Sequence, residues 1–214
     1  MGGPLAKDKA FWWFSVQRYA FDRDPAGPSK LATEVSPRYN GKITWNITPS
    51  DQFTGSFQYD NYTATGRSAF TPQSVADAPP TVSQDSPEAV WNFQYRKIFG
   101  SSTFLEAKYT GYWGYYYLDP EAGPDVNMHY DLGENIRTGS WGSFGYYDRS
   151  RFQANASVSH YAEDFIKGAH DFKFGVEAER SFVRNRTGYT GKDHIRYWDY
   201  YGQPYLAYQY EGYD

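Results

Sequence analysis

The chain has 214 residues with a net charge of −4, and its Lys and Arg residues are scattered, so it lacks the basic stripe of a nucleic-acid partner. It has no cysteine, which excludes disulfides, cysteine-based zinc sites and thiol nucleophiles. Aromatic residues make up 21% of the chain, including 22 tyrosines and 7 tryptophans, whose apolar bodies and polar tips suit a boundary between hydrocarbon and water. A tyrosine-rich soluble β-domain stays open as the alternative.

The N-terminal segment does not have the pattern of a signal peptide. Polar residues follow the aromatic cluster 11–14 at once, and no small-residue cleavage site comes after it. We expect a first strand from about Ala10 to Tyr19. The protein is then either cytosolic or begins upstream of Met1.

Strict alternation of side chains begins at Arg38 and predicts a strand that runs to Thr48. A turn over 49–52 leads to a second alternating run, Phe53 to Asp60. We expect one face to meet lipid through Tyr39, Ile43, Trp45, Ile47, Phe57, Tyr59, Trp91 and Phe93. We expect the other face to meet water through Lys42, Thr44, Gln58, Gln94, Glu106 and Lys108.

Four further runs alternate in the same way, at 89–96, 104–113, 151–159 and 172–179, which gives about seven strands. Each is close to the roughly 9 to 11 residues that a tilted strand needs to cross a bilayer. No apolar run is long enough for a membrane helix, but the strands of a membrane barrel need none. The sequence therefore predicts an all-β antiparallel meander.

The lengths of the connections predict an orientation. Short turns at 49–52, 97–102 and 162–170 alternate with long segments at 20–37, 63–88, 116–149 and 183 onward. Transmembrane barrels keep short turns on the periplasmic side and long loops outside. We therefore expect the segments around Ala76, Gly133 and Gly191 to be extracellular.

Seven strands do not close a bacterial outer-membrane barrel, and an open edge is costly in lipid. We therefore expect residues 1–214 to be an incomplete segment of a barrel, with the neighbouring strands elsewhere in a longer protein. The tail Gln203 to Tyr213 alternates weakly and suggests either an eighth strand or, as we prefer, part of an extracellular hairpin.

Two phrases resemble the TonB-dependent outer-membrane receptors, especially the large-barrel subgroup with a carboxypeptidase-regulatory-like N-terminal domain. The first comprises Gly2, Gly3, Pro4, Leu5, Lys7, Asp8 and Lys9 with the aromatics Phe11 to Phe14, and is similar to the turn and strand that follow the plug domain. The second comprises Gly41, Lys42, Ile43, Thr44, Ile47, Thr48 and Pro49, then Phe53, Thr54, Gly55, Ser56 and Phe57, and is similar to an early barrel hairpin. The resemblance covers an early part of the barrel, without a plug domain, a TonB box or a C-terminal strand.

The resemblance implies a bacterial outer-membrane protein that takes up a scarce ligand, such as a siderophore, cobalamin or an oligosaccharide. The TonB complex would act through the missing plug region, and outer-membrane lipid would surround the barrel. The resemblance implies no enzyme and no cofactor. Two alternatives stay open, namely an independent small porin or adhesin barrel and a soluble carbohydrate-binding β-module.

Candidate ligand-binding residues are aromatics expected near the outer rim: Tyr116, Trp141, Tyr147, Trp198 and Tyr201. The alternative is that they form an interfacial girdle and pack within loops. The histidines lack metal-ligand spacing, and we expect the strand carboxylates to line a wet lumen, so no catalytic residue is predicted. Asp119, Glu121 and Asp125 could hold calcium in an outer loop, although EF-hand spacing is absent.

Overall fold

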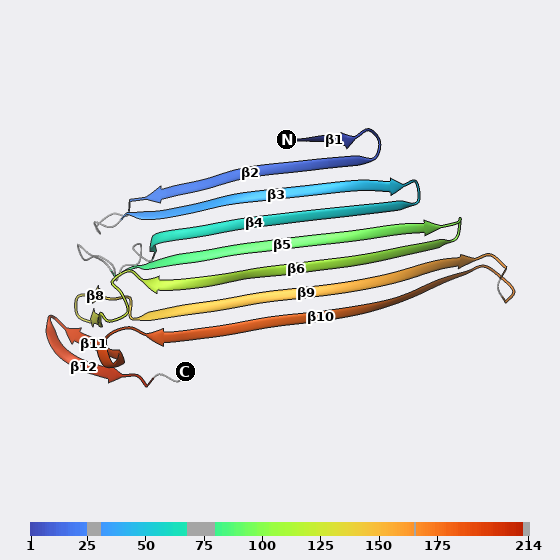
Figure 1. Cartoon of the computed structure of the whole chain (residues 1–214). Helices are drawn as coiled ribbons and strands as arrows, with labels where there is room; N and C mark the ends of the chain where they lie inside the picture. The colour runs from blue at the N-terminus through green and yellow to red at the C-terminus, as the bar shows by residue number, and fades with distance from the viewer. Residues whose placement is uncertain (25–30, 68–79, 165, 212–214) are drawn as a thin grey trace.

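The computed structural model describes residues 1–24, 31–67, 80–164 and 166–211, and within them the chain is almost entirely β-structure (Figure 1). Its long strands are β2 (Ala10–Arg23), β3 (Ala32–Thr48), β4 (Asp51–Arg67), β5 (Val82–Phe99), β6 (Thr103–Pro120), β9 (Ser143–Ala162) and β10 (His170–Tyr189). Its short elements are β1 (Gly2–Ala6), β7 (Met128–Asp131), β8 (Ile136–Gly139), the 3-10 helix η2 (Lys192–His194), β11 (Ile195–Tyr200) and β12 (Gln203–Gln209).

The main sheet is an antiparallel meander in the order β1-β2-β3-β4-β5-β6-β9-β10, which confirms the predicted fold class. It has eight strands, one more than the predicted number. The additional strand is β1, where Gly3 lies opposite Trp12 of β2. The connection between β6 and β9 contains β7 and β8, which do not belong to the main sheet.

Short and long connections lie at opposite ends of the main sheet (Figure 1). The end that carries the turns at 7–9, 49–50, 100–102 and 163–169 is called the turn edge here. The opposite end carries the long connections and is called the loop edge. This arrangement is the one that the connection lengths predict, although Ala76 lies outside the described residues.

The strands are longer than predicted. Runs of about 9 to 11 residues were expected, yet β9 and β10 each contain 20 residues and β3 and β4 each contain 17. The predicted runs end where apolar residues stop alternating with polar ones. Backbone pairing continues beyond that point toward the loop edge, where both faces carry polar side chains and the alternation signal is absent.

A second, smaller sheet lies at the loop edge in the order β12-β11-β7-β8 (Figure 1). Its strands come from two segments that the connection lengths marked as long loops, although weak alternation also suggested a strand or hairpin in the tail from Gln203. β11 and β12 form an antiparallel hairpin, so the tail does belong to a hairpin, and β11 also pairs in parallel with β7. The small sheet therefore ties the connection between β6 and β9 to the segment after β10.

The main sheet is open. Among the described residues, no strand pairs with the outer edge of β1 or of β10, and these two strands do not pair with each other. The described residues contain no helix that is both long and apolar enough to span a membrane. Within the described ranges, the buried apolar side chains include Ala32, Ala64, Val82, Ala89 and Met128.

Candidate functional site

One face of the main sheet is apolar along the middle of its strands. Residues paired across adjacent strands share a face, so the register places Ile43, Gly55 and Phe93 on the same side. This set is called the apolar band and includes Trp12, Phe14, Val16, Tyr39, Ile43, Trp45, Phe53, Phe57, Tyr59, Trp91, Phe93, Tyr95, Leu105, Tyr109, Trp113, Phe152, Val158, Phe174 and Val176. Small residues, such as Gly111 and Ala156, fill the positions between them.

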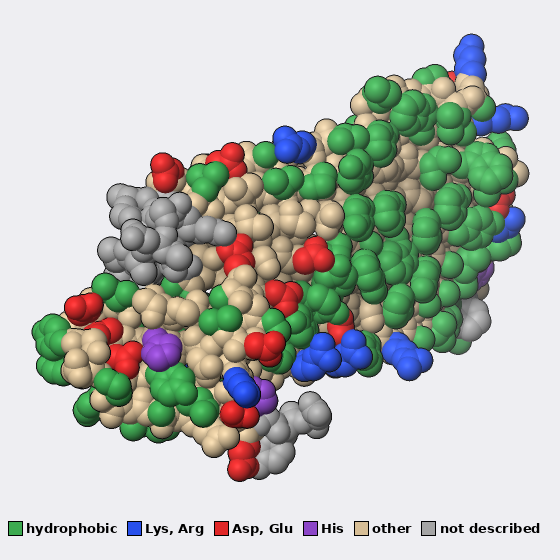
Figure 2. Space-filling model, turned by 60° about the vertical axis from the view of Figure 1, so that its left-hand side comes forward, with side chains coloured by type: hydrophobic (Ala, Val, Ile, Leu, Met, Phe, Trp, Pro, Cys, Tyr) green, Lys and Arg blue, Asp and Glu red, His purple; other side chains and the backbone are tan. Residues whose placement is uncertain are grey.

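The apolar band is exposed. Its exposed fractions reach 48% at Phe57, 43% at Trp113 and 76% at Val176. Contacts among the described elements are mainly those between hydrogen-bonded neighbours, so no second layer covers the band. Figure 2 shows hydrophobic side chains gathered over one part of the sheet, with Asp and Glu concentrated toward the end that carries the small sheet.

The opposite face is mainly polar over the same length, although the exposed side chains of Phe11, Trp13 and Val90 also lie on it. It carries Lys42 beside Ser56, and Asn92 beside Thr110, at paired positions. Glu106 is the centre of a charge network on this face. Its carboxylate oxygens lie 2.6 Å from Lys108 Nζ and 3.1 Å from Arg96 Nε, and Oε2 accepts a hydrogen bond from Gln94 Nε2 at 2.6 Å. Apart from Ile47, which lies in the irregularity between Asn46 and Thr48, the two predicted face sets therefore lie on opposite sides.

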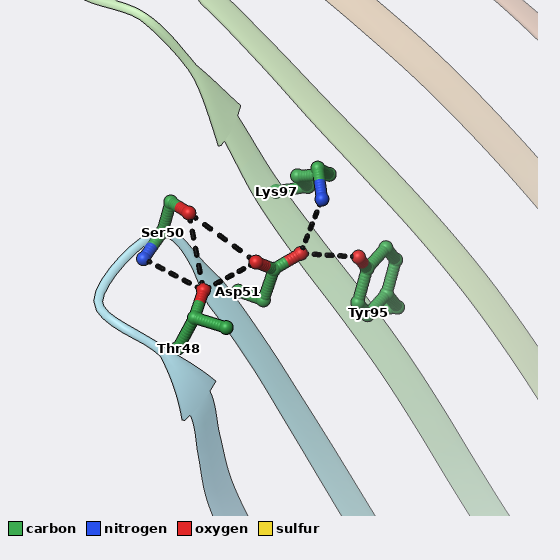
Figure 3. A network of polar contacts seen from close by, with 5 residues as sticks. All are labelled: Thr48, Ser50, Asp51, Tyr95 and Lys97. Atoms are coloured by element: carbon green, nitrogen blue, oxygen red, sulfur yellow. Dashed lines mark hydrogen bonds and ion pairs between the residues drawn. The ribbon is translucent and has the colours of Figure 1, made fainter.

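A polar network bounds the apolar band at the turn edge (Figure 3). Asp51, on the same face as the band, accepts hydrogen bonds from Tyr95 Oη at 2.5 Å and Lys97 Nζ at 2.9 Å. The hydroxyls of Thr48 and Ser50 also donate to its carboxylate. The network joins β3, β4 and β5. Within it, Asp51 and Lys97 neutralise each other next to the exposed aromatic rings.

Tyrosines and carboxylates form the corresponding boundary toward the loop edge. Tyr115 Oη donates to Asp85 at 2.8 Å, and Tyr117 Oη donates to Asp148 at 2.7 Å. Asp148 also pairs with Arg184, with 2.7 Å between the guanidinium and the carboxylate. The tyrosine rings therefore adjoin the apolar band while their hydroxyls are held by charged groups, as expected of aromatic side chains at an interface.

The band includes one close approach that only glycine permits. A Cβ on Gly111 would lie 2.2 Å from the indole of Trp91, which crosses β6 toward Phe152. The ring centroids of Trp91 and Phe152 are 5.8 Å apart. Because Gly111 has no Cβ, the Trp91 ring can lie directly over the backbone of β6.

Two of the five predicted rim aromatics come together on the polar face near the loop edge. Tyr116 of β6 lies opposite Tyr147 of β9, with ring centroids 5.7 Å apart. Arg67 Nη1 donates to Tyr116 Oη at 2.8 Å. Arg67 was not predicted, because its position depends on the register of β4, which has an irregularity between Ala64 and Arg67.

The other three predicted aromatics belong to the small sheet and its turns. Trp141 follows β8. The guanidinium carbon of Arg137 lies over its ring, 4.4 Å from the ring centroid. Trp198 of β11 packs edge-on against Tyr208, and Tyr201 lies in the β11–β12 turn. The five aromatics thus share one end of the molecule without forming a single cluster.

Asp131 joins two distant turns of the small sheet. Its Oδ1 accepts hydrogen bonds from the backbone N–H groups of Gly133 at 2.8 Å, Glu134 at 2.9 Å and Tyr201 at 3.1 Å. Its Oδ2 accepts one from Gly202 N–H at 2.6 Å. These donors, led by Glu134 and Gly202, hold the pKa of Asp131 below its usual value because they favour the ionised carboxylate.

A hollow of about 930 Å³ lies at the turn edge, far from these aromatics in the strand direction. Its lining includes Lys7, Lys9, Asn46, Gln52 and Arg96. The hollow is open to solvent on one side. Because it lies at the turn edge, it does not include the aromatics that the sequence predicts at the other edge.

The described residues contain no group of three His, Cys, Asp or Glu side chains placed to hold a metal ion. Of the carboxylates considered for calcium, Asp119 accepts a hydrogen bond from Tyr146 and Glu121 accepts one from the backbone N–H of Gly66 at 2.9 Å. No family model matches the chain, and no curated protein matches its sequence.

Proposed function

We propose that this chain forms part of the wall of an outer-membrane β-barrel, with the apolar band against lipid and the polar face toward a water-filled interior. The observation that carries the proposal is the exposed apolar band with polar boundaries at both ends. In a soluble domain such a face is buried against another layer of structure. Large exposed apolar patches mark contact with a membrane or a partner.

The dimensions of the band support a membrane location. Along β6 the band extends from Leu105 to Trp113. The eight steps between these two residues span about 27 Å at roughly 3.4 Å per residue. A tilted strand needs about 9 to 11 residues to cross the hydrocarbon core. The strand sections between the band and the loop edge would extend beyond the bilayer into water.

An open sheet in lipid would leave backbone groups without hydrogen-bond partners, at a cost of several kcal/mol for each group. The proposal therefore requires further strands of the intact protein on both sides of this segment. In the resembled TonB-dependent receptors, such a barrel takes up a scarce ligand with energy supplied through the TonB complex. We propose the same role here, with a small molecule or oligosaccharide as ligand, on the strength of the two resembling phrases.

A β-sandwich is the competing architecture, because an open sheet with one apolar face can also form half of a sandwich. The carbohydrate-binding module is the function that would accompany it. The two architectures differ in what covers the apolar band, lipid in the first and a second sheet in the second. An independent porin shares the barrel geometry but would need no TonB partner.

Cysteine labelling of the full-length protein on intact cells tests the membrane location and the orientation. The chain has no cysteine of its own, so single substitutions are free of background within it. Asp125→Cys and Glu134→Cys, both exposed at the loop edge, are expected to react with a membrane-impermeant maleimide. Ser101→Cys, exposed at the turn edge, is expected to react only after the cells are opened. The reverse pattern, or labelling of all three only after lysis, would contradict the proposal.

A further inference from the structure

Two arginines of the small sheet point to the same side. Tyr130 of β7 lies opposite Arg137 of β8, and Met128 of β7 lies beside Arg196 of β11. Met128 and Tyr130 are two residues apart on one strand, so their side chains share a face. Arg137 and Arg196 therefore lie on that face, at the loop edge of the molecule.

The two guanidiniums are held close together by the segment that follows β8. Arg137 Nη1 donates to the carbonyl oxygen of Trp141 at 3.4 Å. Arg196 donates to the next carbonyl oxygen, that of Gly142, from Nε at 3.0 Å and from Nη2 at 2.5 Å. Consecutive carbonyl groups thus anchor two cationic groups side by side.

Neither arginine has an acidic partner within the part of the chain that the structure describes. Elsewhere in that part, Arg38, Arg96, Arg151 and Arg184 each pair with a carboxylate at 2.5 to 3.1 Å. Arg137 Nε is buried and has no hydrogen-bond partner there. A buried donor of this kind costs free energy as long as it has no acceptor.

The electrostatics favour an anion at this place. Burial lowers the pKa of Arg137, and the nearby positive charge of Arg196 lowers it further. Both arginines are partly buried, so water screens their repulsion less than it would at an open surface. A carboxylate between them would remove the repulsion and accept charge-assisted hydrogen bonds.

Aromatic rings hold the two guanidiniums in place. Arg137 lies 4.4 Å from the ring centroid of Trp141 and 5.8 Å from that of Tyr130. Arg196 lies 4.4 Å from the ring centroid of Tyr189. Such stacking covers the faces of the guanidiniums, so a planar anion would bind the N–H groups that do not donate to Trp141 or Gly142, with apolar surfaces beside them.

We propose that Arg137 and Arg196, together with Trp141, form a binding site for a small carboxylate-bearing ligand of the acidic-sugar type. The carboxylate would lie between the guanidiniums, and the ring of the sugar would lie on Trp141. This inference rests on the proposed function, because it names the charge class of the ligand that the loop edge would take from outside.

The test compares two sugars that differ at one carbon. D-galacturonate carries a carboxylate where D-galactose carries a hydroxymethyl group. Each is titrated into the full-length protein in detergent, with intrinsic tryptophan fluorescence as the readout. We expect half-saturation by galacturonate at a concentration at least about tenfold lower than by galactose, which corresponds to about 1.4 kcal/mol. Inorganic phosphate should compete with galacturonate.

Arg137→Gln is the main variant, since it removes the charge but leaves Arg196 and its two hydrogen bonds in place. It is expected to abolish the preference for galacturonate, and Trp141→Phe to reduce the fluorescence change. Arg151→Gln is the matched control, because Arg151 pairs with Glu179 on β10 at 2.5 Å and should leave binding unchanged. Equal affinity for both sugars, or a preference that survives Arg137→Gln, would overturn the inference.

The two proposals fail separately. Binding is measured in detergent and needs no outer membrane, whereas cell-surface labelling needs no ligand. Selective galacturonate binding with failed surface labelling would refute the membrane location and retain the anion site. Correct surface labelling without anion selectivity would retain the barrel and refute the site.

Discussion

The main sheet and the small sheet of this protein are stabilised by different kinds of interaction. The main sheet has long strands, an exposed apolar band and only a few buried apolar side chains. The small sheet has short strands that are held by specific polar contacts, with Met128 only 3% exposed and with Asp131 linking two turns. The main sheet needs lipid or another layer of structure to cover its apolar face. The small sheet is stabilised by polar contacts within itself, which are compatible with a location in water.

The largest effect is expected from a charge placed in the apolar band. Ile43→Arg should destabilise the protein in a bilayer by about 2 to 4 kcal/mol if Ile43 lies near the midplane, because lipid cannot solvate the guanidinium. Lys42→Gln, on the polar face of the same strand, should cost little. Unfolding by denaturant in lipid vesicles measures both, and equal tolerance at the two positions would show that the faces are wrongly assigned.

Gly111→Ala should disturb the main sheet by a smaller amount. The added methyl group would collide with the Trp91 indole and displace it from β6 and Phe152. Overpacking of this kind costs about 1 to 3 kcal/mol. Gly3→Ala is the control, since nothing lies within 4 Å of a Cβ at that position. The same unfolding measurement applies, and similar losses for both variants would refute the proposed collision.

Asp131→Ala should affect the small sheet alone. Loss of the carboxylate leaves four backbone donors of two turns without their acceptor. We expect faster proteolysis at the turns around 131–134 and 200–202, with the strands of the main sheet still protected. Asp125→Ala, at an exposed position of the same connection, is the control. Unchanged cleavage in Asp131→Ala would mean that this carboxylate does not hold the turns together.

The smallest effect is a dependence on pH in the same region. The folded pKa of Asp131 lies below its unfolded value of about 3.9, so its contribution is complete above that value. The contribution is lost as the pH falls through the lower folded pKa. Hydrogen exchange at the 131–134 turn should therefore accelerate as the pH drops below about 4, after correction for the intrinsic rate. In Asp131→Asn this additional acceleration should be absent.

The sequence predicted the main sheet better than the small one, for a physical reason. Alternation of apolar and polar residues around Ile43, Phe57 and Phe93 defines the two faces and the register of a strand in one pattern. At the loop edge, Tyr146 and Asp148 continue β9 on the face of the apolar band, but polar groups interrupt the apolar series there, so the strand length was underestimated. The pattern identifies a strand only where its two faces meet different surroundings.

The candidate site was predicted in part. Aromatic content alone indicated Trp141 and Trp198, but it did not indicate the arginines that accompany them. Arg196 reaches Gly142 across a separation of 54 residues, which no local pattern encodes. Arg137 lies four residues before Trp141 within a tyrosine-rich segment. That spacing was the one feature of the sequence that could have indicated an arginine beside Trp141.

The central claim is that lipid covers the apolar band, and spin labels on the two faces test it most directly. Single cysteines at Phe57 and its neighbour Ser56 in the full-length protein, reconstituted in bilayers, would be labelled and exposed to oxygen and to a nickel chelate. The account predicts high accessibility to oxygen and low accessibility to nickel at position 57, and the reverse at position 56. Low accessibility of position 57 to both reagents, as in the interior of a β-sandwich, would contradict it.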